Sequence, residues 1–317
     1  MPRLIYSPRY NIGFYGLEKL HPFDSRKYGR AWKLLRERFG KRLAEMHVRP
    51  RRQANWQELL RVHSGEYLLK LKKSAYVARA LELPQLQRLP GWMLDWHVLR
   101  AMRWATKGTI VAAEESVEFG LAINLSGGYH HASPGRGEGF SIYADVGVAV
   151  ADLREQGRIS KDARVVYIDT DAHQGNGVCR TFMDDRRAFV FDIFNSQIYP
   201  ADPQARQRID CEIPIDSSCT DTEYMRQLET KLPGFLDSVS KSEVGIAFYN
   251  AGTDVLAGDP LGFLNISAKA ILKRDLFVVS ELRKRGIPTV MVLSGGYTKE
   301  SYRLVADSVT ELLASFR

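Results

Sequence analysis

Short apolar segments recur along this chain, and segments with helical character lie between them. The strand candidates are residues 4–6, 122–125, 165–169, 188–193, 212–215, 244–249 and 288–293. The helix-like segments cover about residues 25–39, 93–118, 141–156, 223–239, 267–285 and 299–315. Several strand candidates are apolar almost throughout, which is typical of parallel strands covered by helices on both faces. The alternation therefore predicts an α/β fold around a mostly parallel sheet.

No linker or low-complexity tract interrupts the alternation, so we expect residues 1–317 to form a single domain. Hydrophobic residues make up 44% and charged residues 26% of the chain, which excludes disordered, collagen-like and coiled-coil proteins. No apolar run is long enough to span a bilayer, and the N-terminus has no secretory signal. Cys179, Cys211 and Cys219 are too few for a disulfide framework. We therefore expect a cytoplasmic protein.

The positive charge of the chain is concentrated in one segment. The whole sequence has 45 Lys and Arg against 37 Asp and Glu, a net charge of +8. Residues 26–52 hold eleven of these basic residues and two acids, Glu37 and Glu45, so the rest of the chain has a net charge of −1. The segment is either a solvated helix face or a surface for an anionic partner. It lacks the interleaved aromatic residues of a single-strand binder, which disfavours nucleic acid.

Polar side chains follow four of the predicted strands at their carboxyl ends, where ligands bind in open α/β sheets. The segments are 127–131, with two glycines, a tyrosine and two histidines; 169–177, with two aspartates and a histidine; 250–254; and 294–297. This convergence of His, Asp and Tyr is the strongest functional signal in the sequence.

Asp171 and His173 are two residues apart, so in an extended segment both side chains point to the same side. Together with Asp254 they would give a site of two carboxylates and one imidazole with an open position, which suits a catalytic Zn²⁺. The alternative for the first pair is a helix cap beside a surface histidine, and the alternative for Asp254 is a turn residue.

The adjacent histidines His130 and His131 could transfer a proton beside such a metal. One imidazole would take a proton from water and return it to a leaving amine, and the carboxylate of Asp169 could orient the pair. Tyr297 could donate its hydroxyl to a developing oxyanion. The alternatives are a histidine pair without a role and a tyrosine at the rim of the site.

Four motifs in this order and spacing resemble the zinc-dependent histone deacetylase family. They are Tyr129-His130-His131-Ala132, Asp169-x-Asp171-x-His173-x-Gly175-Asn176-Gly177, Ala251-Gly252-Thr253-Asp254 and Ser294-Gly295-Gly296-Tyr297. The resemblance covers about residues 4–312. With segments 6–11, 17–24, 139–140 and 258–262, it is most similar to the class IV branch. It implies the arginase/deacetylase fold, with a sheet of about eight strands.

The resemblance also implies roles for individual residues. The zinc ligands would be Asp171, His173 and Asp254. The catalytic residues would be His131 as general base and acid, His130 with Asp169 as its electrostatic partner, Tyr297 as the residue that polarises the carbonyl, and Asn176 behind His131. The substrate-binding residues would be Gly139, Phe140, Tyr199, Gly295 and Gly296. A structural K⁺ or Na⁺ would lie near Asp169.

The sequence departs from the family at two places. Many members have Asp where this chain has Asn176, and a neutral partner would lower the working pKa of His131. Residues 188–194 align poorly with the usual serine of the monovalent cation site, so that site is the weaker of the two cation predictions.

We interpret the chain as a zinc-dependent hydrolase that removes acyl groups from N6-acyl-lysine in proteins or peptides. Class IV relatives favour long fatty acyl chains, which makes defatty-acylation the first substrate hypothesis. One alternative is an amidohydrolase of the same fold that acts on acetylpolyamines or other small amides. Another is an inert module that binds acyl-lysine or nucleic acid through residues 26–52. An arginase-like dimanganese site is disfavoured, because Gln174 and Asn176 stand where bridging carboxylates would be needed.

Overall fold

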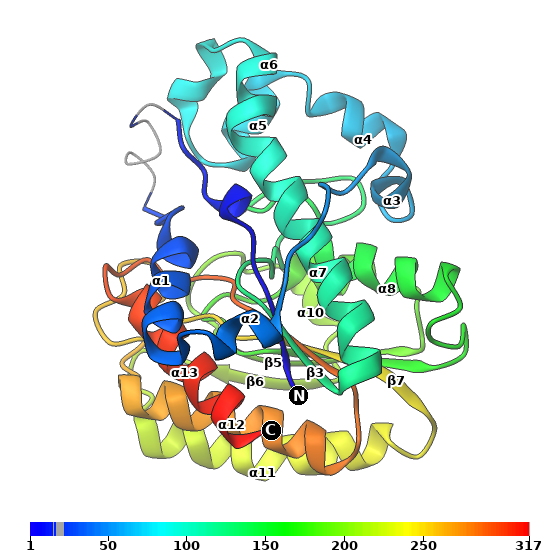
Figure 1. The fold of residues 1–317 in the computed structure, drawn as a ribbon, viewed down its shortest axis with the longest axis vertical. Coiled ribbons are helices and arrows are strands. Elements are labelled where there is room, and N and C mark those ends of the chain that lie inside the picture. The colour runs from blue at the N-terminus through cyan, green and yellow to red at the C-terminus, as the bar shows by residue number, and fades with distance from the viewer. Residues whose placement is uncertain (15, 17–21, 317) are drawn as a thin grey trace.

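A computed structural model of the chain describes residues 1–14, 16 and 22–316, so most of the family-like segment 17–24 lies outside the described residues. It contains one eight-stranded sheet in the order β2-β1-β3-β8-β7-β4-β5-β6 (Figure 1). Every strand pairs with its neighbours in parallel, as the apolar strand pattern predicted. The strands are β1 (Arg3–Ile5), β2 (His47–Val48), β3 (Leu121–Asn124), β4 (Arg164–Asp169), β5 (Ala188–Asn195), β6 (Cys211–Ile215), β7 (Val244–Asn250) and β8 (Thr289–Val292).

The long helices confirm the segments predicted from the sequence. They are α1 (Lys27–Phe39), α7 (Arg100–Phe119), α8 (Asp145–Glu155), α11 (Asp221–Val239), α12 (Ala268–Lys284) and α13 (Ser301–Ser315). The sequence analysis did not resolve the shorter helices, which are α2 (Arg42–Met46), α3 (Trp56–Leu60), α4 (Gly65–Lys70), α5 (Ser74–Ala80), α6 (Gly91–Leu94), α9 (Asn176–Thr181), α10 (Pro203–Arg206), the 3-10 helices η1 (Pro8–Tyr10) and η3 (Pro84–Arg88), and the π-helix η4 (Asp95–Leu99). No helix in the described part of the chain is long and apolar enough to cross a membrane.

Helices cover both faces of the sheet, and the strand residues alternate between two hydrophobic cores. In β4, Val166 and Ile168 pack in one core, whereas Val165 and Tyr167 pack in the other. The first core includes residues of α1, α11, α12 and α13, and the second includes residues of α3 to α8. Because side chains point alternately to the two faces of a strand, strands with apolar residues at nearly every position need a core on each side.

One strand and one helix boundary differ from the sequence prediction. Strand β2 lies inside the basic segment and pairs with β1 through only two residues, His47 and Val48, which is too short to give a periodic signal. The predicted helix at 141–156 begins at Asp145, because the preceding residues form the loops of the site.

The sheet order explains why the four motif-bearing strand ends meet. β3, β8, β7 and β4 are consecutive in the sheet, and since all are parallel, their carboxyl ends lie along one edge. The motifs that are far apart in the sequence therefore form one site.

Candidate metal centre and catalytic pocket

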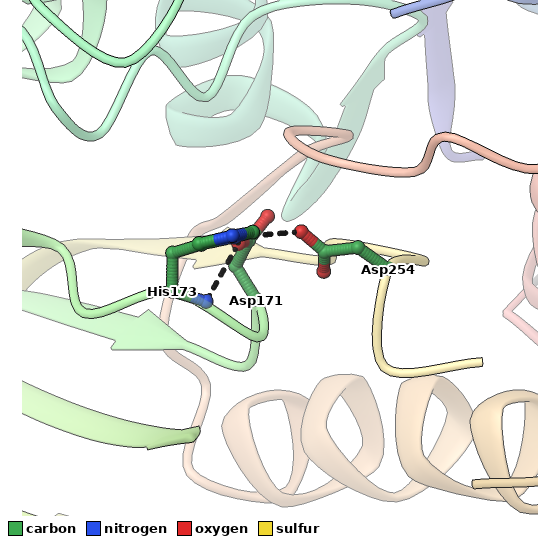
Figure 2. A group of neighbouring side chains, drawn as sticks. All are labelled: Asp171, His173 and Asp254. Atoms are coloured by element: carbon green, nitrogen blue, oxygen red, sulfur yellow. Dashed lines mark hydrogen bonds and ion pairs between the residues drawn. The ribbon is translucent and has the colours of Figure 1, made fainter. Parts of the chain in front are cut away.

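Asp171, His173 and Asp254 lie together beyond the ends of β4 and β7 (Figure 2). All three are buried, and one ligand atom from each lies within 4.8 Å of the others. His173 Nδ1 is 3.1 Å from Asp171 Oδ1 and 3.0 Å from Asp254 Oδ2. This confirms the convergence predicted from their spacing.

The donor set fits a divalent cation. Two carboxylate oxygens and one imidazole nitrogen are the ligands expected of an open catalytic zinc site. Burial and the neighbouring charge of Asp171 raise the pKa of Asp254 to about 7. Burial disfavours the His173 imidazolium, but the two carboxylates overcome this and raise its pKa to about 10. The cluster therefore holds a proton where a cation would bind more favourably, because backbone N–H groups offset only part of the buried negative charge at these atoms.

Two glycines let the backbone approach these carboxylates. A Cβ on Gly252 would lie 2.3 Å from Asp171 Oδ2, and a Cβ on Gly295 would lie 2.2 Å from Asp254 Oδ2. Gly295 N–H instead donates to Asp171 Oδ2 at 2.8 Å, and Ala172 N–H donates to Asp254 Oδ1 at 2.9 Å. These bonds fix the orientation of both carboxylates.

His130 and His131 follow β3, and their ring centroids are 4.0 Å apart. His130 Nδ1 is 2.9 Å from Asp169 Oδ2, and His131 Nδ1 is 2.7 Å from Asn176 Oδ1. Asp169 also accepts hydrogen bonds from Tyr167 Oη at 2.9 Å and Asn250 Nδ2 at 2.9 Å. His130 Nδ1 also lies 3.3 Å from Asn250 Nδ2. Asp169 at the end of β4 and Asn176 at the start of α9 thus hold the two rings through their Nδ1 atoms.

The partners of Asn176 determine which His131 nitrogen is protonated. Asn176 Nδ2 donates to Glu138 Oε1 at 3.0 Å, so its amide oxygen faces His131. That oxygen can only accept, so Nδ1 of the neutral His131 ring carries the hydrogen and Nε2 keeps its lone pair. Glu138 is itself ion-paired with Arg136, which holds the chain of interactions in place.

The two histidines differ in their affinity for a proton. Burial, His130 and His173 lower the pKa of His131 well below its usual value, and Asn176 offsets only part of this. Burial acts in the same direction on His130, but Asp171 and Asp169 outweigh it and raise its pKa. At neutral pH, His131 is therefore the histidine that can accept a proton.

Tyr297 lies on the loop after β8 and faces the same centre. Its ring centroid is 6.2 Å from that of His173 and 6.0 Å from that of Phe140. Burial and the carboxylates of Asp254 and Asp171 raise the pKa of its phenol well above 10, so the hydroxyl remains a donor. Gly296, with a φ of +129°, supplies the turn that presents Tyr297.

Two buried cations hold the loops that carry these residues. Lys27 Nζ donates to the carbonyl oxygens of Ser294 and Gly295, both at 2.8 Å. Burial lowers the pKa of Lys27 to about 8 although nearby carboxylates oppose the change, so the ammonium is still mostly charged at neutral pH. Arg274 of α12 donates to the carbonyl oxygens of Thr170 and Gly252, both at 2.9 Å, and so ties the loop after β4 to the loop after β7.

A pocket with about 940 Å³ of space between its atoms opens above the histidines. Gly139, Phe140, Gly295 and Tyr297 line its polar end. Its other walls are mostly apolar and include Ile12, Phe14, Leu81, Leu83, Leu86, Val98 and Met102. The Tyr199 ring lies 5.1 Å from His131, so this aromatic residue is also at the site. The pocket therefore combines a polar end at the histidines with a mostly apolar wall.

Gly139 is required by the close approach of its loop to His131. Its φ is +52°, and a Cβ there would lie 2.4 Å from His131 Cδ2. Phe140 also has a positive φ, of 64°, and its backbone N–H donates to Ala80 O at 3.1 Å. The loop is therefore anchored to the last residue of α5, directly before Leu81 of the apolar wall.

All thirteen residues predicted from the sequence lie at or directly beside this centre. The sequence analysis assigned no role to Glu138, Asn250, Lys27 or Arg274. Asn250 begins the predicted strand-end segment 250–254, and Glu138 directly precedes Gly139, so both had a usable signal. Lys27 was counted only as part of the basic segment, and Arg274 sits in an ordinary helix pattern, so neither could have been found without the fold.

Comparison with known proteins agrees with the geometry. The histone deacetylase domain model matches residues 21–313. The chain is 43% identical to histone deacetylase 2 of Arabidopsis thaliana over 311 residues, which cover 98% of this chain and 78% of that protein. An HDAC homolog solved in complex with SAHA shares the fold, with a TM-score of 0.76 at 24% identity, covering 98% of this chain and 84% of the other. The HDA15 HD domain has the same TM-score at 18% identity, with 99% and 88% covered.

Proposed function

From the premise that this chain belongs to the histone deacetylase family and is a deacetylase-type hydrolase, we propose that it is a zinc-dependent enzyme of the class IV type that removes acyl groups from N6-acyl-lysine. The observation that carries the proposal is the position of His131, whose Nε2 keeps its lone pair beside the buried cluster of Asp171, His173 and Asp254.

In this proposal Asp171, His173 and Asp254 hold Zn²⁺. The bound ion would supply a Lewis acid that polarises the substrate carbonyl and makes water more acidic. The fit rests on the donor set and on the raised pKa of Asp254, which mark buried negative charge in need of a cation.

In this proposal the histidines carry out the proton transfers. His131 Nε2 takes a proton from the attacking water, and the resulting imidazolium later gives it to the nitrogen of the leaving amine. His130, with its raised pKa and its bond to Asp169, stays the more basic partner and contributes positive charge near the developing oxyanion. A base with a depressed pKa is poised for this work because it is neutral at the start of the reaction.

Tyr297 donates its hydroxyl to the carbonyl oxygen as negative charge develops there. The Gly139 carbonyl accepts the substrate amide N–H, and Phe140 with Tyr199 flanks the aliphatic stem of the lysine. Gly295 and Gly296 shape the loop that brings Tyr297 to the substrate. These roles explain why glycines are needed where the substrate, the loop and the carboxylates crowd together.

We further propose that the enzyme prefers a long-chain fatty acyl group on the lysine. The support is the pocket, whose apolar wall from Ile12 and Phe14 to Val98 and Met102 extends well beyond the space that an acetyl group occupies. Burial of each additional methylene in such a pocket contributes about 0.8 kcal/mol. Affinity should then rise with chain length until the pocket is full.

The test is a series of acyl-lysine peptides of increasing acyl length, with metal content measured on the same sample. We expect one zinc per chain, turnover of acyl-lysine and a lower KM for the longer acyl groups. Faster turnover of acetyl-lysine than of myristoyl-lysine would contradict the long-chain preference alone. Turnover of acetylputrescine without turnover of any acyl-lysine would replace the function by that of a polyamine amidohydrolase.

A second measurement separates catalysis from binding. Tyr297→Phe should lower kcat by ~10²–10³-fold because it removes one oxyanion donor, with zinc content unchanged. Tyr302→Phe, at a half-buried position of α13 that does not line the pocket, is the matched control and should retain full activity. Binding of acyl-peptide without hydrolysis by the zinc-loaded enzyme, together with no effect of Tyr297→Phe, would support the inert-module alternative.

We also propose that residues 1–317 act as one deacylase domain and that its location is cytoplasmic, as the cysteine count predicts. A K⁺ or Na⁺ near Asp169 is supported by the buried Asp192, whose Oδ1 has no hydrogen-bond partner among the described residues. Burial and Asp169 raise the pKa of Asp192 well above its usual value, as expected where a cation would offset two adjacent carboxylates.

A further inference from the structure

Four arginines gather around one hollow at the surface, outside the catalytic pocket. The hollow is lined by Arg9, Arg49, Pro50, Arg51, Arg100 and Trp104. These residues come from three separate parts of the chain: η1, the segment after β2, and the start of α7. The hollow therefore exists only in the folded protein, and the basic segment 26–52 contributes just two of its four arginines.

No carboxylate balances this charge. The lining contains no Asp or Glu, and none of the four arginines has an acidic partner within ion-pair distance in the described chain. Their neighbours in the sequence behave differently: Arg52 is ion-paired with Glu58, and Arg103 with Asp95. Since like charges held together repel one another, the arrangement costs free energy unless an anion occupies it.

Aromatic rings orient two of the guanidinium groups. Arg9 Cζ lies 5.0 Å from the ring centroid of Trp104, and Arg100 Cζ lies 4.2 Å from that of Trp96. A guanidinium stacked on a ring loses less conformational freedom when it binds a ligand, and its N–H groups stay available at the edge. The buried Trp104 also has an indole Nε1–H without an acceptor in the described chain.

The hollow is adjacent to the catalytic pocket but separate from it. Arg9 lines the hollow, whereas the next residue of η1, Tyr10, lines the pocket. In α7, Arg100 and Trp104 line the hollow and Met102 lines the pocket. The same two elements thus form a wall between the two spaces.

We propose that this hollow is a binding site for a small anion that carries two or more phosphate groups. Arginine pairs with phosphate oxygens through two parallel hydrogen bonds. A phosphate group therefore suits a set of guanidinium groups better than a single carboxylate does. A single phosphate would neutralise about half of the four positive charges, so a ligand with at least two phosphates is the better match in charge. This site is independent of the deacylase reaction.

The experiment uses the full chain and three soluble probes, tripolyphosphate, inorganic phosphate and sulfate, titrated by calorimetry at equal ionic strength. We expect one tripolyphosphate per chain, bound much more tightly than phosphate or sulfate. The double variant Arg49→Gln/Arg51→Gln should weaken tripolyphosphate by about 10- to 100-fold, the loss expected from removing charged hydrogen bonds. Both side chains are exposed, so the variant should fold and should melt at a temperature no lower than that of the wild type.

The matched control is Arg36→Gln/Arg42→Gln. It removes the same charge from exposed positions of the same segment, which do not line the hollow. Wild-type affinity in this control supports a built site. An equal loss in both variants would overturn the proposal, because it would show that only net charge matters.

Two further arms identify the source of the phosphate. Vesicles of phosphatidylcholine with a phosphatidylinositol bisphosphate test for a lipid headgroup. If the protein binds these vesicles, and binding is lost in Arg49→Gln/Arg51→Gln but kept in the control, the same phosphate site has a membrane source. Tighter binding to a DNA duplex than to tripolyphosphate would overturn the small-anion proposal in favour of nucleic acid. Absence of saturable tripolyphosphate binding would overturn it outright.

Discussion

The catalytic centre and the arginine hollow both contain residues that follow the carboxyl ends of the strands. Both contain cations, but these cations differ in their burial and in their partners. At the centre, Lys27 and Arg274 are buried, and each donates to the backbone carbonyls of two different residues. At the hollow, Arg49 and Arg51 are exposed and have no acidic partner in the described chain.

The difference follows from solvation. A cation removed from water must find hydrogen-bond acceptors inside the protein, and the loops that provide them become fixed in return. A cation at the surface is solvated and screened, so the fold can leave it for a solute to bind. The buried cations Lys27 and Arg274 are therefore structural, whereas Arg49 and Arg51 remain available for binding.

The largest expected effect is at the buried carboxylates. Asp254→Asn removes one proposed zinc ligand and should lower kcat/KM by ~10³-fold or more, since the metal contributes several kcal/mol to the transition state. Metal content measured on the purified variant should fall from one zinc per chain toward zero. Asp216→Asn, in the half-buried position directly after β6 and outside the pocket, is the control. Full zinc occupancy with full activity in Asp254→Asn would refute the ligand assignment.

The buried cation Lys27 should matter next. Lys27→Met leaves the Ser294 carbonyl without this donor and the Gly295 carbonyl with only its bonds from Thr253, so we expect a loss of roughly 2 kcal/mol in the free energy of unfolding. The loop that carries Tyr297 should also lose its position, and kcat should fall more than KM changes. Urea unfolding and steady-state kinetics measure the two effects. Lys33→Met, on the exposed side of α1, should change neither quantity. Equal changes in the free energy of unfolding and in kcat for the two variants would contradict the contrast between buried and exposed cations.

The pH dependence of catalysis tests the neutral partner of His131. Burial and the neighbouring histidines lower the pKa of His131, so the acid limb of kcat/KM should lie below the usual histidine range. Activity is lost as the pH falls through that pKa, because protonated His131 cannot act as a base.

The double variant Asn176→Asp/Glu138→Gln exchanges the amide and the carboxylate at constant net charge. A carboxylate beside His131 stabilises the imidazolium, so the acid limb should move to higher pH while the basic limb stays in place. The single variant Glu138→Gln is the control for the loss of Glu138. An unchanged acid limb in the double variant would mean that another group controls this part of the profile.

The smallest effect distinguishes the adjacent residues Arg51 and Arg52. Arg51→Gln relieves repulsion in the hollow and should stabilise the protein by less than ~1 kcal/mol at low salt. Arg52→Gln removes the ion pair with Glu58 and should destabilise it. Thermal melting in low and high salt measures both, and high salt should erase the Arg51 effect. Destabilisation by Arg51→Gln at low salt would show that its charge has a partner in solution.

Much of the fold and site could be predicted from local signals. The apolar strands indicated a parallel sheet, and the His, Asp and Tyr residues that follow them indicated where chemistry would occur. Lys27 and Arg274 could not be predicted in this way, because an ammonium that holds the Tyr297 loop and a guanidinium that bridges two loops have no local pattern. The two-residue strand β2 was missed for the same reason, since it is defined only by its pairing with β1.

The sequence by itself determined the chemistry available at each strand end and the total charge of segment 26–52. Only the tertiary structure decided how that charge is used. It buried Lys27 beneath the Tyr297 loop, paired Arg52 with Glu58, and brought Arg49 and Arg51 to Arg9 and Arg100. The physical reason is that a side chain's chemistry is fixed by its residue type, whereas its solvation and its partners depend on which distant segments fold against it.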